Sequence, residues 1–290
     1  MAQPIRKAVI PAAGFGTRFL PATKAQPKEM LPVVDKPVIQ YVVEEAVASG
    51  ITDIIIVTGP GKRAVEDHFD YPYELEKHLL MSKKKALLEE MRHIATMANF
   101  IYVRQKGAYG NATPVLCAKG IVGDEPFAVL WGDEFIYAKP PRLKQMIRVY
   151  KKYEGAVISG IKIPKKKDLS RYGLAKLQPV DDRVSRIIKI VEKPKPEKAP
   201  SNIATHGAYI FPPKIFSIIE KLKPGKGGEV WLVDAINKLA QEQAVYAATI
   251  KGGTYYDTGN KFGLLRANIE FGLKHPETKK DLRKYLRKLR

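Results

Sequence analysis

The chain has 290 residues, which is enough for one large domain or two smaller ones. With 45% hydrophobic residues and an ordinary content of glycine and proline, it has the composition of a globular protein with a sizeable core, which excludes collagen-like and disordered classes. No apolar run approaches the roughly 20 residues of a membrane-spanning helix. The first residues show no export signal, and the single cysteine, Cys117, excludes an internal disulfide. We therefore expect a cytoplasmic protein with no membrane partner.

The net charge is +20, from 50 basic and 30 acidic residues. Such a charge suits nucleic acid, an anionic membrane surface or small polyanions such as nucleotides. Residues 139–198 hold 18 Lys and Arg against six Asp and Glu, but the aromatic residues there are not interleaved as a base-stacking surface requires. We interpret the charge as dispersed surface lysine and expect no specific nucleic-acid partner.

Strand-like and helical stretches alternate through the first half of the chain. Strands are predicted at residues 7–11, 53–58, 100–104 and 127–131, and helices at 38–49 and 114–121, with one or two more within 74–97. This alternation favours βαβ units and a mostly parallel sheet. Ligands of such sheets bind outside the carboxyl ends of the strands. The loops 12–28, 105–113 and 132–134 should therefore converge on one crevice.

The second half contains more hairpin-like strands, followed by helices. Strands are predicted at 156–163, 172–177, 184–192 and 206–211, and helices at 214–222, 230–243 and 261–274. The whole indicates a single α/β domain, with a Rossmann-like, mixed but mostly parallel sheet flanked by helices, a small β subregion and C-terminal helices.

The C-terminal stretch is a basic amphipathic helix in pattern. Its apolar face consists of Leu282, Tyr285, Leu286 and Leu289, and the other positions are rich in Lys and Arg. Such a helix can lie on a membrane, but we prefer docking of its apolar face on the parent domain or on a second subunit. We expect a homo-oligomer, either a dimer or a tetramer.

A glycine-rich loop follows the first predicted strand and reads AAGFGTR over residues 12–18. Its two glycines, Gly14 and Gly16, let the backbone approach a phosphate, and consecutive N–H groups can form an anion nest. It is not a dinucleotide-binding fingerprint, because Phe19 stands where the third glycine is needed, and this excludes an NAD-linked oxidoreductase. Two cations follow on a proline-stiffened loop, Arg18 and Lys28.

The complete run after the strand, GxGTRxxPxTKxxPKEMLPVxDKP, resembles the nucleotidyltransferase family of nucleoside-diphosphate-sugar pyrophosphorylases. The likeness extends along nearly the whole chain, through PVIQYV at 37–42, VEKPK at 191–195 and DTGNKFG at 257–263. The predicted helical stretch at 74–97 resembles a segment found in the branch of this family that uses UTP and glucose 1-phosphate. Membership implies transfer of a uridylyl group from UTP to α-D-glucose 1-phosphate, with Mg²⁺ as cofactor.

The resemblance also implies a role for individual residues. The triphosphate loop would be Ala13, Gly14, Gly16 and Thr17, with Arg18 and Lys28 countering phosphate charge. The base would be read by Gln105 and Gly110, and Mg²⁺ would be held by Asp133 and Asp257. Lys193 would grip the sugar phosphate, and the sugar would contact Gly173, Glu192 and Gly207. Residues 1–135 would mainly bind nucleotide and 136–260 mainly sugar phosphate, with C-terminal helices over 261–290.

The chemistry of this reaction agrees with the residue types present. The attacking oxygen of a sugar phosphate is already an anion, so the reaction needs positioning and charge neutralisation and no general base. Basic residues and a divalent cation suit that task, and no convincing pairing of a nucleophile with a histidine is present.

Two loops depart from the family pattern. The loop expected to touch the base usually reads GLGHA but here reads GNATP over residues 110–114, and Trp131 precedes Gly132 and Asp133 where the family has leucine. Small polar changes can alter discrimination between substrates. Another base or sugar, such as dTTP or another hexose 1-phosphate, therefore stays open, as does a non-catalytic regulatory or nucleic-acid-binding relative.

Overall fold

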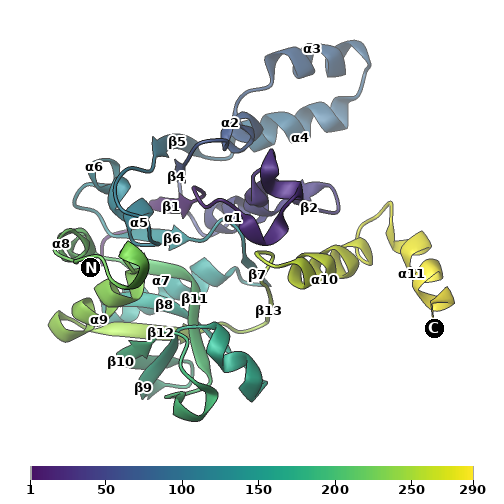
Figure 1. The fold of residues 1–290 in the computed structure, drawn as a ribbon. Coiled ribbons are helices and arrows are strands. Elements are labelled where there is room, and N and C mark those ends of the chain that lie inside the picture. Colours follow the sequence, from purple (N-terminus) through teal and green to yellow (C-terminus); the bar gives the residue numbers. More distant parts are fainter. Residues whose placement is uncertain (1, 290) are drawn as a thin grey trace.

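A computed structural model describes residues 2–289, apart from the side chain of residue 226. Its centre is a nine-stranded mixed sheet with helices on both faces (Figure 1). The strand order is β5-β4-β1-β6-β11-β8-β12-β10-β9. The bounds are β1 Lys7–Pro11, β4 Asp53–Thr58, β5 Asn99–Arg104, β6 Phe127–Leu130, β8 Ala156–Lys162, β9 Leu174–Asp181, β10 Val184–Val191, β11 Ile203–Phe211 and β12 Val245–Thr249.

The predicted α/β fold class is confirmed, and the two halves of the sheet differ in strand direction. Strands β5, β4, β1 and β6 are parallel, with Lys7 of β1 opposite both Asp53 and Phe127. Helices cover both faces of these strands, which explains their continuous apolar sequences. Beyond β6 the sheet is mainly antiparallel. Strand β11 is antiparallel to both of its neighbours, β6 and β8, and β9 forms a hairpin with β10. Strands β8 and β12, in contrast, pair in parallel.

Two large apolar clusters sandwich the sheet. Alternation along β1 shows this directly, because Ala8 and Ile10 belong to one cluster and Val9 to the other. The first cluster packs under α1, α2, α7 and α10, and the second under α5, α8 and α9. The helices are α1 Val38–Val47, α2 Arg63–Phe69, α3 Tyr73–Met81, α4 Lys85–Thr96, α5 Thr113–Cys117, α6 Lys119–Val122, α7 Arg142–Tyr153, α8 Lys214–Glu220, α9 Leu232–Glu242, α10 Lys261–Gly272 and α11 Lys279–Lys288.

Two small ladders complete the fold, and neither was predicted. One pairs β2, Pro32–Val33, with β3, Lys36–Pro37, and the other pairs β7, Phe135–Ala138, with β13, Gly253–Tyr256. In the second ladder Tyr256 lies opposite Phe135. The chain after β13 is thereby brought beside the chain before β7, where Asp133 lies.

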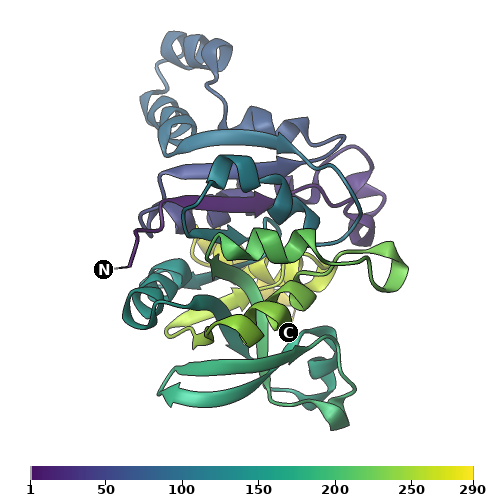
Figure 2. The ribbon, with the colours of Figure 1, turned by 90° about the vertical axis from the view of Figure 1, so that its left-hand side faces the viewer.

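The stretch 74–97 forms two helices, α3 and α4, in agreement with the prediction of one or two helices there, and they project from the body (Figure 2). Other elements differ from the sequence-based prediction. The predicted helix at 114–121 is divided into α5 and α6, and α7 and β12 had not been predicted. Within the described residues no helix is long and apolar enough to cross a membrane.

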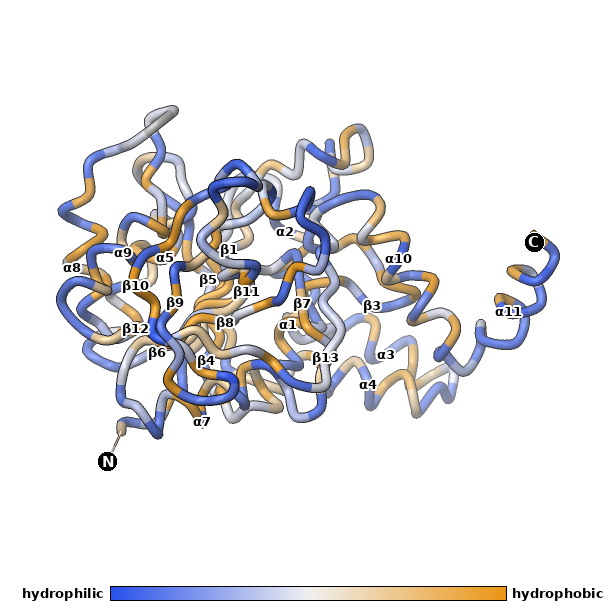
Figure 3. The backbone as a smooth tube through the Cα atoms, turned by 90° about the horizontal axis from the view of Figure 1, so that it is seen from below, coloured by the Kyte–Doolittle hydropathy of each residue, from blue (hydrophilic) through white to orange (hydrophobic). Residues whose placement is uncertain are grey.

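Helix α11 extends from the end of α10 as an arm with mixed polar and apolar colouring (Figure 3). None of its residues is buried, and the exposed fractions of Tyr285 and Leu289 are 59% and 65%. Near its start, Leu282 packs close to Gly272 of α10. Docking of the remaining apolar face stays a prediction.

Candidate active site

A cavity of about 640 Å³ lies at the carboxyl ends of the parallel strands. It brings together residues from both halves of the chain: Arg18, Lys28, Asp133, Glu192, Lys193 and Asp257. A smaller cavity of about 220 Å³ adjoins it and is lined by residues 14–19 of the glycine-rich loop. Both cavities share Arg18, Lys28 and Asp133 as lining residues. The loops 12–28 and 132–134 thus meet as predicted, and the loop 105–113 contributes Asn111.

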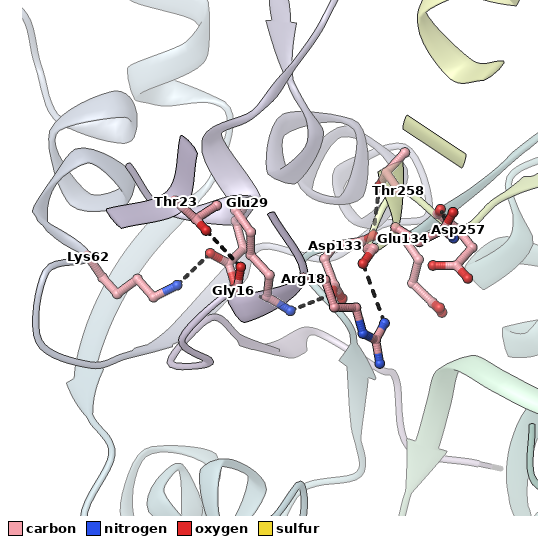
Figure 4. A network of polar contacts seen from close by, with 12 residues as sticks. Gly16, Arg18, Thr23, Glu29, Lys62, Asp133, Glu134, Asp257 and Thr258 are labelled. Atoms are coloured by element: carbon pink, nitrogen blue, oxygen red, sulfur yellow. Dashed lines mark hydrogen bonds and ion pairs between the residues drawn. The ribbon is translucent and has the colours of Figure 1, made fainter. Parts of the chain in front are cut away.

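The glycine-rich loop curls over the Lys28 side chain. Gly16 adopts a left-handed conformation with φ of +68°, and its carbonyl oxygen accepts a hydrogen bond from Thr23 Oγ1 at 2.7 Å (Figure 4). A Cβ atom on Gly14 would lie 3.6 Å from Lys28 Cε. The glycine-rich loop and Lys28 therefore line the same small cavity, and such a combination is suited to an anion.

Lys28 lies at the junction of the two cavities. Its ammonium forms an ion pair with the Asp133 carboxylate and lies 3.9 Å from Glu29 Oε1. Burial would lower the pKa of Lys28, but the neighbouring Asp133 and Glu29 carboxylates outweigh burial and raise it. Lys28 is consequently a permanent positive charge at neutral pH.

The two carboxylates predicted to bind metal lie close together. A Cβ atom placed on Gly259 would be 2.9 Å from Asp133 Oδ2 and 3.3 Å from Asp257 Oδ1. The ladder between β7 and β13 brings the two segments into proximity, and Thr258 Oγ1 donates a hydrogen bond to the Asp133 carbonyl oxygen at 2.6 Å (Figure 4). Arg18 approaches from the other side, donating to the Gly259 carbonyl oxygen at 3.4 Å.

The donor set here is suited to a hard divalent cation. Burial and the nearby Glu134 and Asp133 carboxylates raise the pKa of Asp257. A bound cation would therefore reduce the electrostatic repulsion among these carboxylates. Burial also acts to raise the pKa of Asp133, but the Lys28 ammonium holds it below its ordinary value. Among the described residues no cluster of three or more metal-ligating side chains occurs. A metal at this site would thus complete its coordination with water and ligand oxygens, as Mg²⁺ commonly does.

The wall opposite these carboxylates is built where β10 ends. Lys193 has a left-handed φ of +43°, and its N–H donates to the Tyr172 carbonyl oxygen at 3.2 Å. A non-glycine residue in this conformation is strained, which is common at binding sites. A Cβ on Gly173 would come 2.9 Å from Glu192 Oε2, so this glycine leaves room for the Glu192 carboxylate beside the cavity.

Three predicted binding residues have other structural roles, and their contacts with substrate stay predictions. Gly207, with φ of +85°, makes room for the side chains of Glu134 and Arg142, and its neighbour His206 lines the cavity. Gly110, with φ of +128°, lies directly against the Val230 backbone. The N–H of Gln105 donates to the Thr58 carbonyl oxygen at 2.9 Å, which fixes the start of its loop.

Several residues in or beside the cavity were not assigned a role from the sequence. Glu134 forms an ion pair with His206, and Tyr255 Oη donates to Glu134 Oε2 at 2.9 Å. Burial lowers the pKa of His206, but the Glu134 carboxylate outweighs it, so the net shift is upward. Arg171 Nη2 lies 3.4 Å from Asp257 Oδ2. Glu134 and His206 had a usable signal in the sequence, because they directly adjoin the predicted residues Asp133 and Gly207.

The two unusual loops both reach the cavity. Asn111 Oδ1 accepts a hydrogen bond from the Leu232 N–H at 2.7 Å, which joins the 105–113 loop to the start of α9. Trp131 lines the cavity, and its Nε1 donates to Tyr209 Oη at 3.3 Å with the two rings nearly perpendicular. Trp131 is therefore both packed against Tyr209 and accessible to a ligand.

The fold and the site define a nucleotidyltransferase. A family model described as nucleotidyl transferase matches residues 7–272, and the chain belongs to this family.

Individual relatives show which members of the nucleotidyltransferase family the chain resembles. The chain is 47% identical to a UTP–glucose-1-phosphate uridylyltransferase of Bacillus subtilis (strain 168), over 99% of this chain and 96% of the relative. It also resembles a UTP-bound UGPase structure from Acinetobacter baumannii, with a TM-score of 0.91 and 38% identity, over 99% of this chain and all of that one. A UDP-glucose pyrophosphorylase structure complexed with UDP-glucose aligns with a TM-score of 0.86 and 39% identity, over 94% of this chain and all of that one.

Proposed function

We propose that this protein transfers the uridylyl group of UTP to α-D-glucose 1-phosphate and forms UDP-glucose and pyrophosphate. The observation that carries the proposal is the pair of adjoining cavities whose common wall is Arg18, Lys28 and Asp133. The smaller cavity is suited to the triphosphate, and the larger one has room for a nucleoside and a sugar phosphate. The relatives named above have this activity or these ligands in their names.

The reaction is an in-line displacement at the α-phosphorus of UTP. An oxygen of the sugar phosphate forms the new P–O bond, the bond to the bridging oxygen of the β-phosphate breaks, and pyrophosphate leaves with that electron pair. No proton has to be removed from the attacking oxygen. Lys28 and Arg18 offset the negative charge of the phosphates, and Lys193 holds the sugar phosphate in line with the α-phosphorus.

We assign the cofactor as Mg²⁺, held by Asp133 and Asp257. When bound there it would neutralise charge on the phosphate oxygens. The chain's own contribution is to hold both carboxylates against Gly259 and to keep the Lys28 ammonium next to them. That arrangement places three charged groups where the two substrates must meet.

Substrate selection is assigned to the loops around the cavity. We assign the triphosphate to Ala13, Gly14, Gly16 and Thr17, the base to Gln105 and Gly110, and the sugar to Gly173, Glu192 and Gly207. The chain departs from the family pattern in the loop 111–114 and at Trp131, and of these residues Asn111 and Trp131 line the cavity. If the protein prefers another base or hexose, these two residues are the first places to look for the cause.

The experiment that tests the proposed function is pyrophosphate release with Mg²⁺ over a grid of substrates. UTP, dTTP, ATP, CTP and GTP are each combined with glucose, galactose and N-acetylglucosamine 1-phosphates. Dominant activity with UTP and glucose 1-phosphate is expected. Dominant activity with another pair would move the assignment to a different base or sugar, and no activity with any pair would favour a non-catalytic relative.

We further propose a cytoplasmic homo-oligomer that binds neither nucleic acid nor membrane. The exposed apolar face of α11 supports self-association, with Tyr285 and Leu289 as its most accessible members. Light scattering that finds only a 32.5 kDa species at micromolar concentration would contradict the oligomer. Binding to arbitrary nucleic acid with a steep dependence on salt would contradict the absence of that partner.

A further inference from the structure

A buried ion pair lies behind the Lys28 side chain and belongs to neither cavity. Lys62 Nζ contacts Glu29 Oε2 at 2.8 Å, and the two side chains are 6% and 1% exposed (Figure 4). Lys62 comes from the loop after β4, whereas Glu29 lies next to Lys28 in the chain. Ions buried to this degree carry a large desolvation cost, so their retention calls for an explanation.

Glu29 faces a lysine on each side. Its Oε2 contacts Lys62, while its Oε1 lies 3.9 Å from Lys28 Nζ. The Glu29 side chain is also fixed by packing, because a Cβ on Gly132 would come 3.3 Å from Glu29 Cγ and 3.3 Å from the Pro11 carbonyl oxygen. Gly132 directly precedes Asp133, so the Glu29 side chain packs against the segment that carries Asp133.

The charges along this row alternate in sign: Lys62, Glu29, Lys28 and Asp133. With Lys62 in place, the negative charge of Glu29 is largely compensated. Without Lys62, two carboxylates would act on the single ammonium of Lys28, and in a site shielded from water their attraction is stronger than in solvent. The Lys28 ammonium would then be drawn toward Glu29 and away from a bound phosphate.

We propose that Lys62 is a positioning residue for nucleotide binding, acting through Glu29 to leave the Lys28 ammonium available to the phosphates of the substrate. This inference rests on the proposed function, because it assumes that Lys28 contacts the triphosphate. Lys62 itself stays buried and touches no substrate.

The test compares Lys62→Met with Lys7→Met. Lys7 also forms an ion pair, with Glu125 at 2.9 Å, but this pair is more exposed, at 20% and 37%, and lies at the amino end of β1, opposite the site. The measured quantity is the dissociation constant for UTP by calorimetry, with thermal unfolding recorded for each variant. We expect Lys62→Met to weaken UTP binding about tenfold and Lys7→Met to leave it within about twofold.

Glu29→Gln separates positioning from a purely structural role. It removes the negative charge but keeps an oxygen for Lys62, and we expect UTP binding no weaker than in the unmodified protein. A structural role for the pair predicts that Lys62→Met and Glu29→Gln both weaken binding. If Lys62→Met does not fold, the double variant Glu29→Gln/Lys62→Met replaces it, with binding expected close to that of the unmodified protein.

A double-mutant cycle with Lys28→Ala provides the decisive comparison. In the Lys28→Ala background, Lys62→Met should cause no further loss of UTP affinity. An equal loss with and without Lys28 would overturn the inference, as would unchanged UTP binding in folded Lys62→Met. Failure of the unmodified protein to form UDP-glucose would instead overturn the proposed function, while the cycle of UTP dissociation constants still decides the role of Lys62.

Discussion

The hydroxyl of Thr258 donates a hydrogen bond to the backbone carbonyl of Asp133 at 2.6 Å. Thr258 is buried and directly follows Asp257, so this bond ties together the two segments that carry the proposed metal ligands. The β7–β13 ladder brings the segments to the same place, and the hydrogen bond fixes their spacing. Precise placement of two carboxylates matters more for Mg²⁺ than for larger ions, because Mg²⁺ demands near-octahedral geometry.

Thr258→Val should therefore weaken metal binding more than it destabilises the fold. Valine has a similar shape but cannot donate to the Asp133 carbonyl, and a lost hydrogen bond of this kind corresponds to roughly three- to tenfold in a binding constant. We expect the Mg²⁺ concentration for half-maximal activity to rise by about that factor. Thr258→Ser keeps the hydroxyl and is the control. Equal metal requirements in the valine and serine variants would contradict the prediction.

Asp257→Asn should have opposite effects on activity and stability. Turnover should fall roughly 10²-fold, because a carboxylate proposed to hold the cofactor is lost. The raised pKa of Asp257 means that its ionised form is less favourable in the folded chain than in the unfolded chain at neutral pH. Removing the charge should thus raise the unfolding temperature of the metal-free protein. Calorimetry that shows a lower unfolding temperature would contradict this account of the site.

Lys193→Ala should reduce the use of glucose 1-phosphate with little effect on UTP. Lys193 lines the large cavity but not the smaller one beside the glycine-rich loop. We expect kcat/KM for glucose 1-phosphate to fall by roughly 10²-fold, with an unchanged dissociation constant for UTP. Lys195→Ala is the matched control, since Lys195 is exposed two residues further along and lines neither cavity. A comparable loss in both variants would indicate a general charge effect.

Much of the fold was accessible from the sequence because its signals are local. The bounds of β1 and β4 match the predicted ranges, since each is a short apolar run that ends at a change of composition. The β7–β13 ladder was missed because it joins two four-residue strands far apart in the chain, and nothing in either strand identifies its partner. That ladder is what places Asp257 beside Asp133.

In the candidate site, too, residues with a local sequence motif were predicted, and residues related only through the fold were not. Arg18, Lys28, Asp133 and Lys193 were predicted from their motifs, and they line the same cavity. The Lys62–Glu29 pair could not be predicted, because two ordinary charged residues 33 positions apart become a unit only once burial brings them together. Gly207 illustrates a different difficulty. A glycine in a strand indicates a close approach, but the sequence does not reveal that Glu134 and Arg142 make it.

Gly207→Ala tests this last relationship through stability. A Cβ at residue 207 would overlap the buried Glu134 carboxylate and Arg142 guanidinium, and the φ of +85° is itself unfavourable for alanine. We expect a loss of about 2–4 kcal/mol in the free energy of unfolding, measured by urea denaturation. Gly120→Ala is the control, because Gly120 lies within α6 with no atom near its Cβ position. It should be neutral or stabilise the protein by about 0.5–1 kcal/mol. Equal stabilities of the two variants would show that Glu134 and Arg142 can move aside, and would remove the packing explanation for glycine at residue 207.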